Sequence, residues 1–345
     1  MKPSRDKAQY GNEKGVSVQH YLNRMLHNIL VATDTNSQSE KFAVILSLID
    51  WSQAFDRQSH QLGIQSFVDN GVRPSLIPYL MSYFQDRKMV VKWNGAISSA
   101  RPLNGGGPQG ATLGLLEYLA QTNHNTDFLD VKEKFKFIDD LSILEIINLI
   151  MMGISSYNFK SHVASDIGEH GQYIAPENLK SQTYLDNISS WTDEKQMKLN
   201  TTKSKYMVIN FTKDWQFSTK LSIEGHDLQQ VSQTKLLGVW ITDDLKWAKN
   251  TAEVVRNSYA RMTMFRKLNS FEIPVEDLLN IYVLFIRSRL EQSAVVWHAS
   301  ITQGEEIELE RVQKVALRLF LREDYESYAN AMSVTNLEAL KARRE

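Results

Sequence analysis

The sequence predicts an α+β domain followed by a mainly helical domain. Short apolar runs of strand length lie before about residue 241, whereas the patterns after residue 252 are mostly helical. Strands in one part of a chain and helices in the next are typical of an α+β domain joined to an all-α domain. The 345 residues are enough for two or three structural units.

Composition excludes several classes of protein. Hydrophobic residues make up 42% and charged residues 23%, as in ordinary globular proteins, so a mainly disordered chain is excluded. The absence of cysteine excludes disulfides, thiolate chemistry and cysteine-ligated zinc. The polar N-terminus lacks a signal peptide, and the most apolar run, 141–154, is too short to span a bilayer. We expect an intracellular protein without membrane association, in either nucleus or cytoplasm.

The first elements are a helix and a buried strand. Residues 16–30 carry apolar side chains at helical spacing, which predicts an amphipathic helix. Residues 42–49 form a nearly continuous apolar run rich in branched side chains, which predicts a buried strand. Asp50 follows directly, at the strand's C-terminal end.

Turn residues divide the next part of the chain. Asn70-Gly71 and Pro74 separate two helices, and Asn94-Gly95 is a strong hairpin signal. The expected elements are two helices within 59–85, hairpin strands at 88–93 and 96–103, a glycine-rich loop at 105–110 and a helix at 111–122.

A second hairpin is expected at 135–144, with Asp139-Asp140 at its turn between strands 135–138 and 141–144. The polar segment 157–176 reads as a loop excursion. The remaining elements are a helix at 181–197, strands at 206–211 and 235–241, and helices from 252 onward punctuated by Pro274 and Gly304.

Three carboxylates stand out from these patterns. Asp50 ends a buried strand, and Asp139 and Asp140 lie at a hairpin tip. If strand and hairpin are neighbours in one sheet, the three converge, and their repulsion raises their pKa values unless a cation neutralises them. Hard oxygen ligands favour Mg²⁺, and two such ions serve phosphoryl transfer. Taken singly, each aspartate also fits a solvated turn residue.

Positive charge gathers in one later segment. The chain's net charge of -1 does not indicate a nucleic-acid partner. Residues 246–270, however, contain six cations and one acidic residue, Glu253. The cations are Lys246, Lys249, Arg256, Arg261, Arg266 and Lys267. A local basic helix can contact phosphates, although a solvated helix face fits the same charges.

Five segments occur in the order of known polymerase motifs. They are 48–56 (LIDWSQAFD), 106–114 (GGPQGATLG), 137–140 (FIDD), 199–205 (LNTTKSK) and 235–239 (KLLGV) followed by 245–247 (LKW). In this order they resemble motifs A to E of reverse transcriptases of the non-LTR retrotransposon type. Residues 9–30 are similar to the segment before motif A, and the resemblance extends to about residue 330.

The resemblance implies a polymerase palm, an antiparallel sheet with flanking helices, followed by a mainly helical thumb. It assigns 1–40 to a remnant of the fingers and an N-terminal helix, 41–241 to the palm, and 242–345 to the thumb and C-terminal connection. Only 49 residues precede Asp50, so we expect an N-terminally truncated chain with incomplete fingers and no assignable triphosphate clamp. Motif B departs from the family at Gly107 and Ala111, where an aliphatic residue and serine are usual.

The resemblance also carries over catalytic roles. Asp50 and Asp139 would bridge two Mg²⁺ ions, with Mn²⁺ as a substitute, while Asp140 completes the set and the Trp51 backbone carbonyl adds a ligand. Lys203 matches the lysine proposed to protonate the leaving pyrophosphate, a role for which a cation is physically suited. A surface lysine fits the same position.

Binding roles follow from the other motifs. Phe55 matches the steric gate that favours deoxynucleotides, with a core aromatic as the alternative. Gln109 and Gly110 match the loop beside the incoming nucleotide, where an ordinary glycine-rich turn is the alternative. Leu236, Leu237 and Gly238 match the primer grip. The basic helix then becomes a thumb element that contacts duplex phosphates.

The expected function is RNA-directed DNA polymerisation, with an RNA template, a DNA primer and deoxynucleoside triphosphates as partners. The alternative is a catalytically inactive, truncated or domesticated derivative that binds nucleic acid. A nucleotide cyclase also uses paired carboxylates and two metals, but the FIDD segment and the primer-grip pattern argue against it.

Overall fold

The computed structural model describes residues 6–34, 40–108, 110–130, 132–154, 172–212, 215–269, 271 and 273–344. The chain forms two compact units, Met1–Val231 and Ser232–Glu345. Each is considered by itself below. The expected domain boundary after residue 241 would fall inside strand β15 (Val239–Thr242), which pairs with β14 (Gln233–Leu236). The two units instead divide before this hairpin, between Val231 and Ser232.

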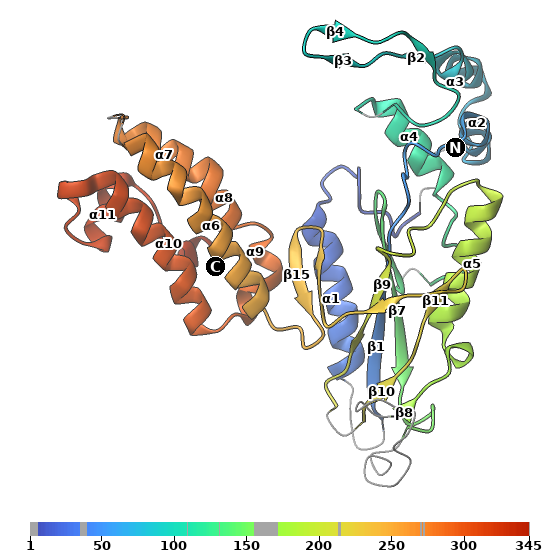
Figure 1. Cartoon of the computed structure of the whole chain (residues 1–345). Helices are drawn as coiled ribbons and strands as arrows, with labels where there is room; N and C mark the ends of the chain where they lie inside the picture. The colour runs from blue at the N-terminus through green and yellow to red at the C-terminus, as the bar shows by residue number, and fades with distance from the viewer. Residues whose placement is uncertain are drawn as a thin grey trace. The chain divides into compact units, whose positions relative to one another are not determined.

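A five-stranded sheet organises the first unit (Figure 1). Its strands, in the order β13-β9-β1-β7-β6, are β13 (Gln229–Gln230), β9 (Lys205–Ile209), β1 (Phe42–Ile49), β7 (Asp140–Asn148) and β6 (Lys134–Phe137). The central strand β1 is antiparallel to both neighbours, and among the described strands of this sheet only β13 runs parallel to its partner, β9. A mainly antiparallel sheet with flanking helices confirms the expected fold class.

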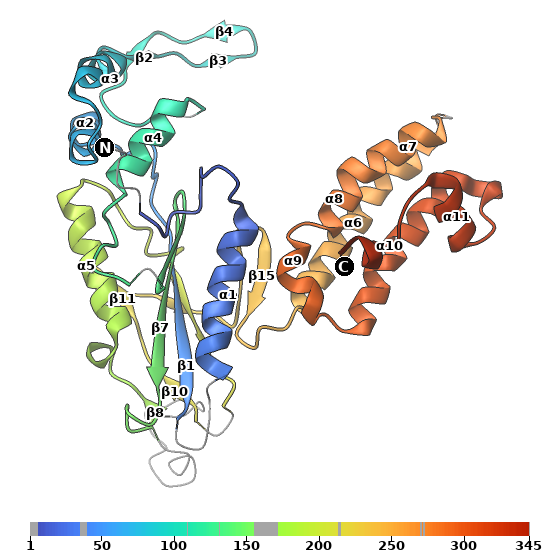
Figure 2. The ribbon, with the colours of Figure 1, turned by 180° about the vertical axis from the view of Figure 1, so that it is seen from behind.

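Helices α1 (Val18–Asp34) and α5 (Lys180–Glu194) cover opposite faces of the sheet (Figures 1 and 2). Alternate side chains of a strand point to opposite faces. The Tyr21 hydroxyl of α1 therefore reaches the Ser142 hydroxyl of β7, 2.5 Å away, on one face. On the other face, Ile45 of β1 shares a core with Ile188 of α5.

A small helical layer adjoins the sheet. It contains α2 (His60–Asp69), the 3₁₀ turn η1 (Pro74–Leu76), α3 (Ile77–Phe84) and α4 (Thr112–Gln121). The two helices expected within 59–85 are confirmed. Phe67, Leu80 and Phe84 form their own apolar cluster. The ribbon expected at 88–103 is also present, as β2 (Lys88–Met89) with β5 (Arg101–Pro102) and β3 (Lys92–Trp93) with β4 (Ala96–Ile97).

Short elements complete the first unit. They are β8 (Gln172–Tyr173) paired with β10 (Phe217–Ser218), the 3₁₀ turn η3 (Pro176–Asn178), and β11 (Ser222–Ile223) paired with β12 (His226–Asp227). Of the loop excursion expected at 157–176, residues up to 171 lie outside the described part of the chain.

The second unit is a hairpin followed by helices. The single strand expected at 235–241 is wrong: β14 and β15 form a hairpin whose turn, Leu237-Gly238, has φ values of 48° and 91°. Glycine supplies the second positive φ at little steric cost. The helices are α6 (Ala248–Asn269), α7 (Val275–Tyr282), the π-turn η4 (Val283–Arg287), α8 (Ser288–Leu290), α9 (Ala294–Trp297), η5 (His298–Ser300), α10 (Gln303–Leu321), η6 (Arg322–Asp324), α11 (Tyr328–Thr335) and α12 (Leu340–Arg344). None of the helices in the described ranges is long and apolar enough to cross a membrane.

Candidate active site

Strand register brings Asp50 beside the second hairpin. Ile49 pairs with Leu141 on the neighbouring strand, so the next positions along the two antiparallel strands are Asp50 and Asp140. The strand and the hairpin are therefore neighbours in one sheet, which is the condition under which the three carboxylates were expected to converge. Asp50 is held in place by its backbone: its N–H donates to the Ser204 hydroxyl at 3.0 Å, and its carbonyl accepts from the Asn200 N–H at 2.8 Å.

The hairpin turn differs by one residue from the expectation. Phe137 pairs with Asp140, so the two-residue loop is Ile138-Asp139 and Asp140 opens β7. Ile138 has a φ of 59°, which is an outlier for a β-branched residue. A positive φ at the first loop position is the feature of a type II′ turn, which matches the twist of the flanking strands. Sequence propensity missed it because neither loop residue is glycine.

Electrostatics link the three carboxyl groups. Burial raises the pKa of Asp140 to about 6, and the charges of Asp139 and Asp50 add to the shift. Burial also raises the pKa of Asp50, an effect that Lys203 and a hydrogen bond from Asn200 partly offset and that Asp139 reinforces. Repulsion of this kind is what a divalent cation would relieve, so the donor chemistry fits a metal. Within the described ranges, however, no three His, Cys, Asp or Glu side chains are gathered into a ready metal-ligating group.

The side chain and the backbone carbonyl of Trp51 have different surroundings. The ring is buried in the core against Trp191, with ring centroids 5.9 Å apart. Ser52 N–H donates to the Lys198 carbonyl and Asn200 N–H to the Asp50 carbonyl, so Trp51 and Leu199 face each other as a non-hydrogen-bonded pair. The Trp51 carbonyl therefore points away from residues 198–200.

The Lys203 side chain is exposed on the turn after Leu199. Its backbone is fixed, because its N–H donates to the Asn200 carbonyl and side-chain oxygen, both at 3.2 Å. Its charge lowers the pKa of Asp50, which places a cation within electrostatic reach of the carboxylates. Asn200 lies in the motif-D-like segment and was not assigned a role from the sequence.

Phe55 and the glycine-rich loop pack together. The half-buried Phe55 ring lies 4.8 Å from the Tyr118 ring, and its carbonyl accepts from the Gly107 N–H at 2.7 Å. A Cβ on Gly107 would lie 2.0 Å from the Gln58 side-chain oxygen, so a larger residue here would require the Gln58 side chain to move. Gly110 is exposed with a φ of 81°. Gln109 lies outside the described residues.

Two buried polar side chains beneath this loop were not anticipated. Gln58 is 1% exposed and Glu117 is fully buried, and their side-chain N and O atoms have no hydrogen-bond partner among the residues that the structure describes. Burial raises the pKa of Glu117 to about 8. The sequence pattern does not mark Gln58, which precedes α2, or Glu117 on α4 as buried, because their burial depends on tertiary packing.

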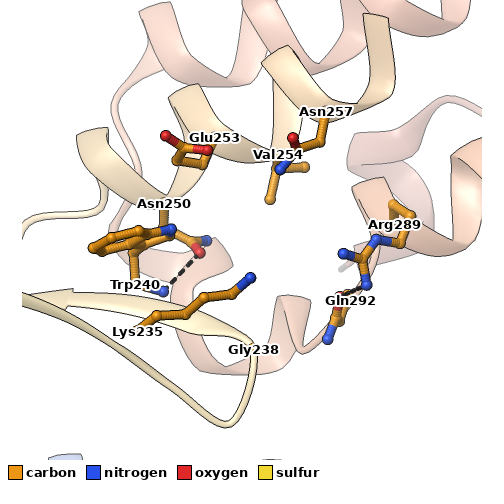
Figure 3. Close-up of a pocket in the computed structure, with 9 residues that line it drawn as sticks. All are labelled: Lys235, Gly238, Trp240, Asn250, Glu253, Val254, Asn257, Arg289 and Gln292. Carbon is orange, nitrogen blue, oxygen red and sulfur yellow. Dashed lines mark hydrogen bonds between the residues drawn. The ribbon is translucent and has the colours of Figure 1, made fainter. Parts of the chain in front are cut away.

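The expected primer-grip residues occupy the β14–β15 turn of the second unit. Leu236 is buried, while Leu237 and Gly238 form the turn. A small pocket beside this turn is lined by the side chains of Lys235, Trp240, Asn250, Glu253, Arg289 and Gln292, among others (Figure 3). Asn250 accepts from the Trp240 N–H at 3.1 Å, which ties the hairpin to α6.

The basic residues of α6 and the turn before it are partly neutralised. Glu253 pairs with Arg256 at 2.6 Å and with Lys249 at 3.6 Å, and Lys246 pairs with Asp244 at 3.2 Å. Arg261 donates to the Phe285 carbonyl at 2.6 Å. The side chains of Arg266 and Lys267 are exposed in the last turn of α6. Ion pairs with Glu253 and Asp244 therefore offset part of the positive charge of this segment.

Comparison with known proteins gives consistent sequence matches. No family model matches the chain. It is 25% identical over 267 residues to the probable RNA-directed DNA polymerase from transposon BS of Drosophila melanogaster, covering 75% of this chain and 26% of that protein. It is 23% identical over 296 residues to the probable RNA-directed DNA polymerase from transposon X-element of the same organism, covering 84% and 29%.

This chain is similar to the RNA-directed DNA polymerases of mobile elements. A third match, the RNA-directed DNA polymerase from mobile element jockey of Drosophila melanogaster, is 23% identical and covers 72% of this chain and 25% of that protein. The resemblance found from the motifs is thereby confirmed. The chain spans about a quarter of the length of these RNA-directed DNA polymerases.

Solved structures give weaker matches. Apo telomerase from Candida tropicalis aligns with a TM-score of 0.44 and 12% identity, over 95% of this chain and 48% of that one. Telomerase from Candida albicans, in complex with a fragment of telomeric RNA, aligns with a TM-score of 0.43 and 12% identity, over 96% and 56%.

Proposed function

We propose that this chain is a catalytic portion of an RNA-directed DNA polymerase, which adds deoxynucleotides to a primer 3′-hydroxyl on an RNA template. The observation that carries the proposal is the placement of Asp50 and Asp140 at adjacent strand positions, with Asp139 in the turn between β6 and β7. The first unit would supply the palm and the second the thumb. The RNA-directed DNA polymerases that are 25% and 23% identical to this chain support the assignment.

The residues of this chain would have two chemical roles, metal binding and stabilisation of the leaving group. Asp50, Asp139 and Asp140 would hold two divalent cations, Mg²⁺ or Mn²⁺, with the Trp51 carbonyl as a further oxygen ligand. When bound, such ions align and neutralise the attacking and leaving oxygens of phosphoryl transfer. Lys203 would place positive charge where pyrophosphate develops negative charge.

Substrate recognition would fall to the neighbouring segments. Phe55, fixed against Tyr118, would close the space beside the sugar and favour deoxynucleotides. Gln109 and Gly110 would lie beside the incoming nucleotide. Residues 236–238 would contact the primer strand, and the exposed cations of α6 would contact duplex phosphates.

The test is primer extension by the purified full chain on matched RNA and DNA templates, with Mg²⁺ and with Mn²⁺. Wild type should extend the primer on RNA, and Asp139→Ala should abolish extension. Asp186→Ala is the matched control, because it removes an aspartate from the exposed side of α5. A folded wild type that extends no primer, or an Asp139→Ala variant that still does, would contradict the proposal.

A second candidate function is nucleic-acid binding without catalysis. It is favoured by one observation: within the described ranges the carboxylates are not gathered into a metal-ligating group. Such a protein would bind duplex at low salt, lose affinity steeply as salt rises, and be indifferent to Asp139→Ala. Binding that requires both metal and the three aspartates would exclude this candidate.

A further inference from the structure

The two-stranded ribbon of residues 88–102 is exposed along its whole length. Figure 1 shows it extending from the end of α3, away from the sheet. Every residue from Lys88 to Pro102 is exposed, including Trp93 at 80% and Ile97 at 65%. An isolated two-stranded ribbon is marginally stable in water, and exposed apolar side chains on it call for a partner.

The tip of the ribbon presents an aromatic ring. Asn94 and Gly95 have φ values of 46° and 85°, the signature of a type I′ turn, so the strands remain paired up to Trp93. Trp93 pairs with Ala96, whose methyl group is too small to cover an indole. The flat face of the ring is therefore open to a planar ligand.

The charge of the ribbon has one sign. Residues 87–104 contain Arg87, Lys88, Lys92 and Arg101 and no acidic residue, in a chain whose net charge is -1. Arg87 is engaged, because its guanidinium lies over the Tyr83 ring and donates to the Tyr83 carbonyl. Of the other three cations, none pairs with an acid anywhere in the described ranges. Their charge is available to an anionic partner.

A cation and the aromatic ring lie on opposite faces of the ribbon near its tip. Lys92 and its cross-strand partner Ile97 occupy one face, while Trp93 occupies the other. A partner with a regular line of negative charges and flat apolar groups satisfies both faces at once. Single-stranded nucleic acid has this chemistry, since its phosphates meet cations and its unpaired bases stack on aromatic rings.

We propose that the 88–102 ribbon binds single-stranded nucleic acid, with Trp93 as the stacking residue and Lys88, Lys92 and Arg101 as phosphate contacts. This surface is separate from the carboxylates, and the proposal goes beyond polymerisation because it requires neither metal nor catalysis. An acidic protein surface would meet the charges, but it would leave the indole face without a planar partner.

The test measures binding of the full chain to fluorescein-labelled 20-mers by anisotropy, in EDTA and without nucleotides. Two probes are compared: oligo(dT) and an abasic strand with the same phosphates. Wild type should prefer oligo(dT), and Trp93→Ala should reduce that preference by about 10-fold. Lys92→Ala should weaken the binding of both probes equally, and it should lower the slope of log affinity against log salt concentration by about 0.7.

Tyr173→Ala is the matched control, since it removes another exposed aromatic ring from a short strand of the same unit. It should change neither the base preference nor the salt slope. An unchanged preference in Trp93→Ala, or competition by polyglutamate as effective as by oligo(dT), would overturn the proposal. A loss of blunt-duplex binding in Trp93→Ala as large as its loss of oligo(dT) binding would do the same. Because EDTA removes divalent metal, these outcomes stand apart from the success or failure of primer extension.

Discussion

The side-chain oxygen of Gln9 accepts a hydrogen bond from the backbone N–H of Ile138 at 2.9 Å. The same oxygen accepts from the Gly11 N–H at 2.9 Å. Gly11 itself must be small, because a Cβ there would lie 2.6 Å from the Ile138 backbone and side chain. The N-terminal segment therefore clamps the strained turn that carries Asp139.

Gln9→Ala should loosen this turn. Loss of one buried acceptor costs about 1–3 kcal/mol, which corresponds to roughly 10-fold faster hydrogen exchange at the Ile138 amide. Exchange of a 135–141 peptide, read by mass spectrometry, measures this. Gln121→Ala is the control, because it removes a buried glutamine that donates to the Lys195 carbonyl instead. Equal exchange in wild type and Gln9→Ala would show that Gln9 does not hold the turn.

Gly107→Ala should destabilise the first unit. The new methyl group would collide with the Gln58 side chain, and overpacking of this kind costs about 1–3 kcal/mol. Adding Gln58→Ala opens the space, so the double variant should recover most of the loss. Urea unfolding of wild type, the two single variants and the double variant gives the coupling free energy between the two positions. If the changes in unfolding free energy of the two single variants simply add, the methyl group at position 107 does not contact Gln58.

Glu117 should make stability depend on pH. Its folded-state pKa is raised to about 8 by burial, so it stays protonated where the unfolded chain has already released the proton. This group's contribution is fully present below about pH 4.5 and is lost as pH rises toward 8 and above. Glu117→Gln should flatten that dependence while leaving the packing against Gly63 similar in shape.

The measurement for Glu117 is the free energy of unfolding at pH 5 and pH 8.5, in wild type and Glu117→Gln. Wild type should lose more stability between the two values than the variant. Identical pH dependence of the two proteins would mean that Glu117 ionises normally in the folded state.

Phe55→Val should admit ribonucleotides under the proposed function. Removing the ring that packs on Tyr118 would free space beside the sugar, and a loss of about 1–3 kcal/mol in discrimination corresponds to roughly 10-fold or more. Single-nucleotide incorporation of a ribonucleotide against the matching deoxynucleotide measures it. An unchanged ratio, with normal thermal stability, would show that Phe55 acts only as a core aromatic.

Sequence patterns predicted the elements whose local signals agree with their packing. The 42–49 run became β1 without change, and Asn94-Gly95 became the ribbon turn. The patterns failed where a tertiary contact decides the backbone. Ile138 adopts a positive φ that its type disfavours, and the Gln9 clamp that accompanies it comes from a segment 129 residues earlier. The Leu237-Gly238 turn was missed because a short apolar run reads as one strand.

In the candidate site, too, local patterns predicted some features and tertiary contacts decided the others. The sequence placed Asp50 at a strand end and left open whether that strand neighbours the second hairpin; the register shows that it does. The buried polar residues Gln58, which lies against Gly107, and Glu117, which lies against Gly63, carry no sequence signal, because their burial depends on tertiary packing. The basic residues of α6 were visible in sequence, but their pairing with Glu253 was not.

The central claim, that three carboxylates perform polymerisation, is tested most directly by RNA-templated primer extension with Asp50→Asn, Asp139→Asn and Asp140→Asn. Each change keeps the shape of the side chain and removes its charge. The account predicts that each variant folds like wild type and loses extension by about 100-fold or more, since the three act as one unit. Wild-type rates in any one of the three would contradict it.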